Sequence, residues 1–161
     1  MKRFIIYLLP ALAGLLAGSC TTVAEPEGDL SAAPLVIRSG TSFGMCMGYC
    51  YTEVAIASET TTLTGKSFRN KEQYPDKQCS SNTTQDDWQA LRGLINREAL
   101  RRLPQTIGCP DCADGGAEWI EVEEGNSTHR VTFEYNSNVP EIGPLLNKVR
   151  ESRNRQRQQC L

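Results

Sequence analysis

Cysteine is the residue type with the clearest chemical meaning in this 161-residue chain, which contains seven of them. One lies close to the N-terminus and six are spread over the remaining sequence: Cys20, then Cys46, Cys50, Cys79, Cys109, Cys112 and Cys160. If Cys20 is modified separately, the other six form an even set, as disulfide bonding requires. Because exported chains fold in an oxidising compartment, we predict three disulfides. We favour a bond between Cys79 and Cys160, since one precedes the first predicted helix and the other ends the last.

The other four cysteines could instead bind a metal ion. Their spacing, Cys-x3-Cys and then Cys-x2-Cys, supplies two pairs of sulfur ligands, and four thiolates suit zinc. Met45 and Met47 add two thioethers, which suit copper(I). A periplasmic zinc- or copper-binding protein is therefore the alternative to a disulfide-bonded one. Its ligands would be Cys46, Cys50, Cys109 and Cys112. The leading interpretation, three disulfides, needs no cofactor.

Catalytic chemistry finds little support in the sequence. The segment Cys109-Pro110-Asp111-Cys112 is similar to a thioredoxin active site, but that site needs a strand before it and a helix after it. Here a predicted helix precedes the segment and a predicted strand follows it. His129, the only histidine, is in phase with Val131 and Phe133 at the end of a predicted hairpin, so we expect a half-buried structural side chain. We therefore predict no catalytic residues and a non-enzymatic protein.

Three acidic residues close to this segment, Asp111, Asp114 and Glu118, raise the question of a calcium site. They lack the alternating acidic positions of a calcium-binding loop. The sequence Asp114-Gly115-Gly116 is instead typical of a turn, because Asp and Gly adopt backbone conformations that most residues avoid. We therefore expect a turn at these residues and no bound metal.

The N-terminus has the pattern of an export signal. Met1-Lys2-Arg3 is basic, and the apolar stretch of residues 4–16 is shorter than the roughly 20 residues that span a bilayer. Small residues then lead to the first cysteine, and Leu16-Ala17-Gly18-Ser19-Cys20 resembles the lipobox of bacterial lipoproteins. In that family the cysteine thiol receives a diacylglycerol, the signal is cut before it, and the new amino group is acylated. An ordinary secretion signal cut after Ser19 is the alternative.

Lipidation of Cys20 would anchor the protein to a membrane, since each buried methylene contributes about 0.8 kcal/mol. Thr21 stands where an Asp would signal retention in the inner membrane, so similarity to enterobacterial sorting favours the outer membrane. The following residues are small, acidic or proline, which is typical of a flexible tether. We predict a signal peptide (1–19), a lipidated cysteine with its tether (20–34) and a single domain (35–161).

Alternating side chains predict two hairpins. The predicted strands cover residues 35–37, 52–58, 60–68, 118–123 and 129–135. The first hairpin turns near Ser58-Glu59, and the second turns at Gly125-Asn126. Residues 71–81 are polar and are expected to form a loop.

Start and stop signals predict helices after the first hairpin and at the C-terminus. Thr84 is the expected N-cap of the first helix. Asn96 is the expected N-cap of a second short helix, which ends before Pro104. The last helix begins at Pro140 or Pro144. Its predicted buried stripe consists of Ile142, Leu145, Leu146 and Val149. We expect its basic tail to be solvated rather than bound to anionic lipid. This tail carries Lys148, Arg150, Arg153, Arg155 and Arg157.

The order of elements is strands, helix, strands, helix. This order predicts an α+β fold in which an antiparallel sheet has two helices packed on one face, with disulfides as staples. The net charge of −2 gives no reason to expect a nucleic-acid partner. The expected partners are the membrane, through Cys20, and an envelope protein or other envelope component.

Two long phrases carry a further signal. They are Phe43-Gly44-Met45-Cys46-Met47-Gly48-Tyr49-Cys50 and Gly108-Cys109-Pro110-Asp111-Cys112-Ala113-Asp114-Gly115-Gly116-Ala117-Glu118-Trp119. Both resemble an uncharacterised domain family found in lipoproteins of Bacteroidetes-type bacteria, over about residues 35–150. The resemblance implies a secreted or envelope-attached domain, but that family has no assigned activity. We therefore predict a non-enzymatic, lipid-anchored envelope protein that binds or scaffolds another envelope component.

Overall fold

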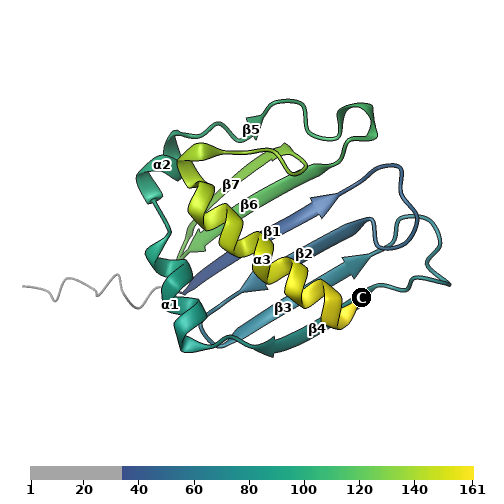
Figure 1. Ribbon diagram of the computed structural model, residues 1–161, viewed down its shortest axis with the longest axis horizontal. Coiled ribbons are helices and arrows are strands. Elements are labelled where there is room, and N and C mark those ends of the chain that lie inside the picture. The colour runs from purple at the N-terminus through teal and green to yellow at the C-terminus, as the bar shows by residue number, and fades with distance from the viewer. Residues whose placement is uncertain (1–33) are drawn as a thin grey trace, which may run out of the picture. The chain divides into compact units, whose positions relative to one another are not determined.

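One seven-stranded sheet contains every strand of residues 34–161, the residues that this computed structural model describes (Figure 1). The strands are β1 (Leu35–Ser42), β2 (Tyr51–Ile56), β3 (Thr60–Lys66), β4 (Lys77–Asn82), β5 (Thr106–Ile107), β6 (Ala117–Glu124) and β7 (Ser127–Glu134). Their spatial order is β4-β3-β2-β1-β6-β7-β5, and all neighbours are antiparallel except β5 and β7. The predicted signal peptide (1–19), Cys20 and residues 21–33 of the predicted tether lie outside the described residues.

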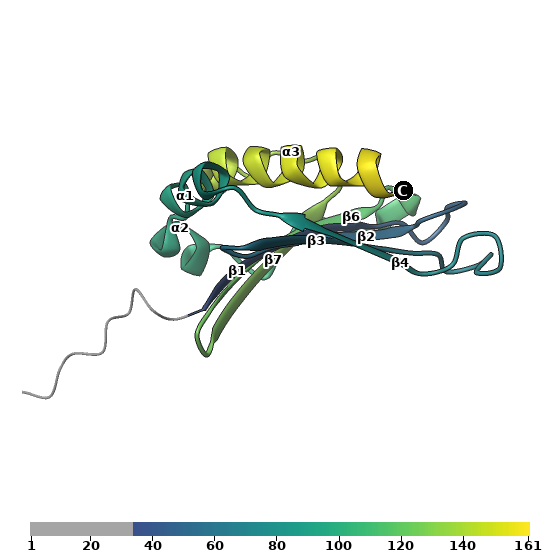
Figure 2. The same cartoon turned by 90° about the horizontal axis from the view of Figure 1, so that it is seen from below.

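The helices form a second layer. They are α1 (Gln85–Gly93), α2 (Arg97–Arg102) and α3 (Gly143–Cys160), and two short 3₁₀ turns are η2 (Cys112–Asp114) and η3 (Pro140–Ile142). Figure 2 shows α1 and α3 over one face of the sheet, and α3 packs against β1, β2 and β3. The second helical piece, α2, packs against β7 and η3. The predicted α+β fold, an antiparallel sheet with two helices on one face, is confirmed.

The helix boundaries follow the predicted capping residues. The hydroxyl of Thr84 accepts a hydrogen bond from the backbone N–H of Asp87 at 3.2 Å, which satisfies one of the free amides at the start of α1. The side chain of Asn96 does the same for Ala99 at 3.0 Å in α2. Helix α2 ends before Pro104, because proline cannot continue a helix. These local signals were sufficient to predict both helices.

Two strands escaped prediction. Residues 77–82 form β4, although residues 71–81 were expected to be a loop. Polar residues with no apolar alternation have little intrinsic strand preference, and this strand lies at the edge of the sheet, where such residues are tolerated. It is fixed by its pairing with β3 and by the bond from Cys79 to α3. Strand β5 has only two residues, too few for a periodic pattern.

Helix α3 buries one face along its whole length. The predicted stripe of Leu145, Leu146 and Val149 is at most 1% exposed. The same face continues through Arg153, Gln156 and Cys160, which are also buried. The C-terminal half of α3 therefore meets the sheet through polar groups. Between residues 34 and 161, no helix has both the length and the apolar character that a membrane crossing requires.

The other face of the sheet carries no helix (Figure 2). Trp119 lies there across Gly40, its partner on β1, where any Cβ would collide with the indole ring. The guanidinium of Arg130 covers the indole at 4.5 Å, and the ring of Tyr51 packs beside it at 5.3 Å. Burial and a hydrogen bond to Glu53 raise the pKa of Tyr51, so its phenol stays protonated. This face is thus polar with a small aromatic centre.

Candidate functional site

Three loops meet at one end of the sheet, which we call the loop end. They are residues 43–50 between β1 and β2, residues 67–76 between β3 and β4, and residues 108–116 between β5 and β6. In Figure 1 they extend to the right of the strands. The chain enters the sheet at the opposite end, where the carbonyl oxygen of Pro34 accepts a hydrogen bond from Gly125 in the β6–β7 turn at 3.0 Å.

Disulfides close two of the three loops. Cys46 is bonded to Cys50 in the first loop, and Cys109 to Cys112 in the third, with Cα–Cα distances of 5.7 and 5.5 Å. The third disulfide, Cys79–Cys160, joins β4 to the last turn of α3 at a Cα–Cα distance of 6.0 Å. The three predicted disulfides are present, and the bond favoured from the sequence is one of them.

The first and third loops are packed together although they are far apart in sequence; Gly44 and Asp111, for example, are 67 positions apart. The ring of Phe43 meets that of Tyr135 edge-on, with centroids 4.9 Å apart. Phe43 also lies against Gly116, where any Cβ would overlap its ring and where φ is +83°. The N–H of Gly44 points to a carboxylate oxygen of Asp111 at 3.5 Å. Glycine is therefore required at position 116 for both backbone conformation and space.

The third loop has an unusual backbone. Asp111, Ala113 and Asp114 all have positive φ, between 53° and 62°. Gly108 and Gly116, which begin and end the loop, also have positive φ, at 69° and 83°. Left-handed backbone costs a residue such as alanine about 1 kcal/mol or more. Hydrogen bonds hold this conformation: Asp111 N–H to Gly116 at 3.1 Å, and Cys109 N–H to the Glu134 carboxylate at 3.0 Å. The predicted Asp-Gly-Gly turn is confirmed.

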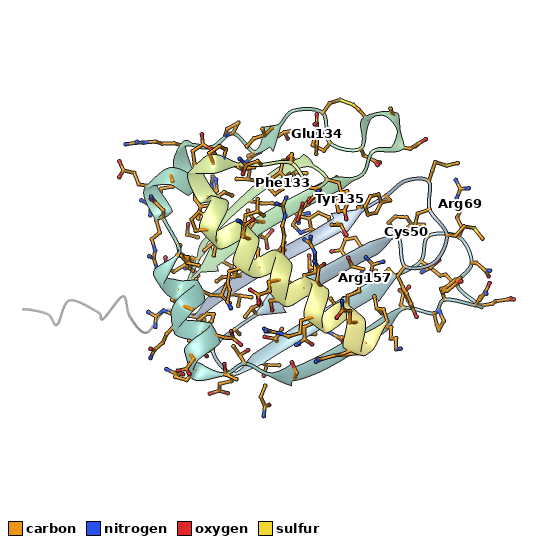
Figure 3. All side chains as sticks on the ribbon, in the orientation of Figure 1. Cys50, Arg69, Phe133, Glu134, Tyr135 and Arg157 are labelled. Atoms are coloured by element: carbon orange, nitrogen blue, oxygen red, sulfur yellow. A yellow bond between two sulfur atoms is a disulfide. The ribbon has the colours of Figure 1, made fainter. Side chains whose placement is uncertain are left out.

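The second loop joins this cluster through aromatic and sulfur contacts. The ring of Tyr74 meets that of Tyr49 edge-on, with centroids 5.8 Å apart. The guanidinium of Arg69 lies 3.0 Å from the sulfur of Met45. Figure 3 shows Arg69 and Cys50 together at this end of the molecule. The second loop is therefore in contact with the first.

Large apolar side chains are exposed mainly at the loop end. Among residues 34–161, five large hydrophobic side chains are exposed, and four lie here: Met45 (59%), Met47 (85%), Phe68 (50%) and Tyr135 (46%). The fifth, Leu94, lies at the C-terminal end of α1. Methionine is flexible and polarisable, so such a surface adapts to the shape of a protein partner. Four exposed apolar side chains at one end of the sheet make this end the candidate interaction surface.

The described residues do not assemble the alternative metal site. Within residues 34–161, no three His, Cys, Asp or Glu side chains lie close enough together to hold a metal ion. The four cysteines of that alternative are instead bonded in pairs, Cys46 to Cys50 and Cys109 to Cys112. The acidic residues considered for calcium are also separated: Asp111 and Asp114 are exposed in the third loop, whereas Glu118 is fully buried.

Glu118 is the centre of a buried ionic cluster between β6 and α3. Its carboxylate accepts two hydrogen bonds from Arg150, at 2.9 and 2.7 Å, and one from Arg153 at 2.7 Å. It also accepts the N–H of Asn136 at 3.1 Å, and Arg153 donates to Ser39 on β1 at 2.8 Å. Burial alone would raise the pKa of Glu118, but the hydrogen bonds and charges of the two arginines outweigh it and hold this pKa below its usual range.

This cluster corrects the prediction of a solvated basic tail for Arg150 and Arg153, whereas Arg155 and Arg157 are exposed as predicted. Arg153 is only 5% exposed, and Arg150 is engaged with Glu118 and with the carbonyl oxygen of Ser137. The signal was present in the sequence, because Arg153 continues the buried stripe four residues after Val149. The ionic cluster ties α3 to the sheet, and its central carboxylate, Glu118, is fully buried, so its role is structural.

His129 takes the structural position expected of it. It is half-buried on β7, opposite Val122 of β6 and in phase with Val131 and Phe133. Its Nε2 atom is buried and makes no hydrogen bond within the described part of the chain.

The fold and the loop end define a class: a disulfide-bonded α+β domain with helices on one sheet face and closed loops at one end. No model of a known protein family matches the chain, and a comparison with curated proteins finds no match either. The loop end was only partly visible in the sequence. The phrases around Cys46 and Cys109 marked two loops, but Phe68 and Tyr135 had no local signal that would group them with Met45.

Proposed function

We propose that this chain is a non-enzymatic lipoprotein of the cell envelope that binds an envelope protein through its loop end. Its anchor is a lipid on Cys20, and its location is the outer membrane. The proposed relatives are the uncharacterised lipoprotein domains of Bacteroidetes-type bacteria. This proposal is based on the resemblance of residues 43–50 and 108–119, most of which lie at the loop end. Binding rather than catalysis is supported by the exposed apolar side chains at the loop end.

The observation that carries the proposal is the position of the loop end. Pro34 lies beside the β6–β7 turn, whereas Met45, Met47 and Phe68 lie at the other end of the same sheet. A chain held by its N-terminus can present that end to a partner. Disulfides fix the conformation of two loops before binding, which lowers the entropic cost of association.

The binding surface is tested by photo-cross-linking in envelope preparations. A photo-reactive phenylalanine analogue at Met47 is compared with the same analogue at Leu94, which is also apolar and exposed but caps the C-terminal end of α1. We expect one discrete cross-linked product from position 47 and none from position 94. The product should disappear when Met45→Ser and Phe68→Ser are added, because these changes remove apolar surface without altering buried groups.

Three results would overturn the proposed binding surface. These are equal cross-linking from both positions, no product from position 47, or a product that survives Met45→Ser and Phe68→Ser. Circular dichroism and the free energy of unfolding provide the control, since exposed substitutions should change stability by no more than about 0.5 kcal/mol.

The anchor is tested separately. The full-length chain is expressed in a bacterium fed with radiolabelled palmitate, beside the variant Cys20→Ser. We expect label and membrane fractionation in the wild type and the loss of both in the variant, because the acyl chains supply the membrane affinity. Equal membrane fractionation without label in either protein would contradict lipidation at Cys20.

A further inference from the structure

A recess of about 300 Å³ lies on the helix-covered side of the sheet, far from the loop end. It is bounded by β3 and β4 below, by α1 on one side and by the middle of α3 on the other. Small-molecule sites of proteins begin at about this volume. The recess is separate from the loop end, so an inference about it is independent of the proposed function.

Charged side chains line the recess unevenly. Asp87 of α1 lies 3.3 Å from the ammonium of Lys148 and 3.5 Å from the guanidinium of Arg155, both on α3. These distances exceed the roughly 2.7–2.9 Å of strong charge-assisted hydrogen bonds. Lysine has three N–H donors and arginine has five, so most of their donors remain available to a ligand. Glu151 of α3 is a second carboxylate partner of Lys148, 3.6 Å from its ammonium. The recess therefore presents two cations whose carboxylate partners, Asp87 and Glu151, all lie beyond the distances of strong hydrogen bonds.

Asp87 remains ionised in this setting. Burial acts to raise its pKa, but the hydrogen bond from Lys148 and the positive charge of Arg155 outweigh it, so its pKa lies below the usual value. Each of its two oxygens already faces one of these cations. The recess consequently has little acceptor capacity left for a ligand ammonium group, which argues against an amino acid as the ligand.

Neutral polar groups supply the rest of the lining. Gln156 is 8% exposed and donates its amide N–H to Ser81 at 2.7 Å, which leaves its carbonyl oxygen as an acceptor. Thr61 and Thr83 form a hydroxyl pair at 2.8 Å at the same recess, and Ser152, which is 5% exposed, adds another hydroxyl. Amide and hydroxyl groups of this kind recognise ligand hydroxyls, since each can donate or accept.

We propose that this recess binds an acidic monosaccharide, a small ring that carries one carboxylate and several hydroxyls. Its carboxylate lies between the ammonium of Lys148 and the guanidinium of Arg155. Its hydroxyls face the amide of Gln156 and the neighbouring Ser and Thr side chains. A neutral sugar would leave the two cations, Lys148 and Arg155, without a ligand charge. A simple organic acid would leave the hydroxyl and amide groups of the lining without ligand partners. An acidic monosaccharide engages both sets of groups.

The test uses three matched probes with the full-length chain in mild detergent. D-glucuronate carries both features, D-glucose has the hydroxyls without the carboxylate, and acetate has the carboxylate without the hydroxyls. Calorimetry and amide NMR shifts report affinity and position. We expect D-glucuronate to bind at least about tenfold more tightly than either other probe, as hydrogen bonds to charged groups allow. The shifted signals should include the side-chain amide of Gln156.

Variants on α3 separate the site from a general charge effect. Arg155→Gln should weaken D-glucuronate binding about tenfold, since it removes one of the two cations. The control is Arg157→Gln on the same helix, which removes the same charge from a residue outside the recess and should leave affinity unchanged. Arg155 is 45% exposed in its side chain, so its variant should fold normally.

The proposal is overturned if D-glucuronate binds no more tightly than D-glucose, or if acetate binds equally well. It is also overturned if Arg155→Gln has no effect or if both variants weaken binding equally. Because loop-end cross-linking does not depend on this recess, the two proposals succeed or fail separately.

Discussion

Replacement of Glu118 by glutamine tests whether the buried ionic cluster holds α3 on the sheet. The carboxylate is fully buried and accepts four hydrogen bonds, from Arg150, Arg153 and the backbone of Asn136. Glutamine has nearly the same shape but no charge, and its NH₂ group faces arginine donors instead of accepting from them. Two guanidinium groups would remain at the sheet without their counter-ion.

The size of the effect follows from this geometry. Removal of one partner from a buried ion pair costs about 3–5 kcal/mol, because the remaining charge stays buried and unpaired. Arg153 is 6% exposed in its side chain and cannot move to solvent without lifting α3, whereas Arg150 at 17% is only slightly freer. We therefore expect Glu118→Gln to lower the free energy of unfolding by about 3–5 kcal/mol. The melting temperature should fall by roughly 10–20 °C.

Urea denaturation, followed by the fluorescence of Trp88 and Trp119, measures the change. The matched control is Glu121→Gln, on the same strand but on the face without helices, where the carboxylate pairs with Arg38 and Arg130 at 3.4 and 3.5 Å. That ion pair is partly solvated, so its loss should cost no more than about 1 kcal/mol. A cost below about 1 kcal/mol for Glu118→Gln, or equal costs for both variants, would refute the reasoning.

The same carboxyl predicts a pH dependence. Because the pKa of Glu118 is lower in the folded protein than in the unfolded chain, ionised Glu118 stabilises the fold above the unfolded value of about 4.3. This stabilisation is lost as the pH falls through the folded pKa. Below about pH 5 the free energy of unfolding should therefore decline more steeply for the wild type than for Glu118→Gln. Parallel declines in urea titrations of the two proteins would contradict the prediction.

Three further substitutions test the staples, the loop end and the helix cap. Replacement of both Cys79 and Cys160 by Ser should lower the free energy of unfolding by about 4–5 kcal/mol, because the bond spans 81 residues. Urea denaturation under oxidising conditions measures this cost, and a cost below about 1 kcal/mol would argue against the bond. Gly116→Ala should cost about 1–3 kcal/mol through strained φ and collision with Phe43; an unchanged melting temperature would mean that this loop packs differently. Thr84→Ala should cost about 1 kcal/mol by leaving an amide of α1 unsatisfied, and unaltered urea unfolding would argue against the cap.

Local patterns were enough to predict most elements of the fold. Alternation identified both hairpins, and Gly125-Asn126 identified a turn, because a strand with one buried face must repeat every two residues. Thr84 and Asn96 identified two helix starts, because their side chains satisfy amides within the next three residues. These features depend on neighbours in the chain, and the sequence contains all of them.

Long-range contacts account for what local patterns missed. Strand β4 has no apolar alternation and exists because β3 supplies its hydrogen bonds. Arg153 is buried because Glu118, 35 residues away in sequence, supplies its charge partner. The helical spacing already placed Arg153 on the buried stripe of α3. A basic side chain stays buried only where a counter-charge meets it, and the position of that carboxylate depends on the tertiary structure.

The same distinction applies to the candidate sites. The even set of six cysteines, the two loop phrases and the α+β order are properties of composition and spacing, and they are visible before any coordinates. Tertiary structure alone places Met45, Phe68 and Tyr135 at the same end of the sheet and brings Asp87 close to Lys148 and Arg155 at the recess. Side chains that share a surface need no common spacing in the sequence, because the strand order of the sheet and the packing of α1 and α3 on it decide which of them lie close together.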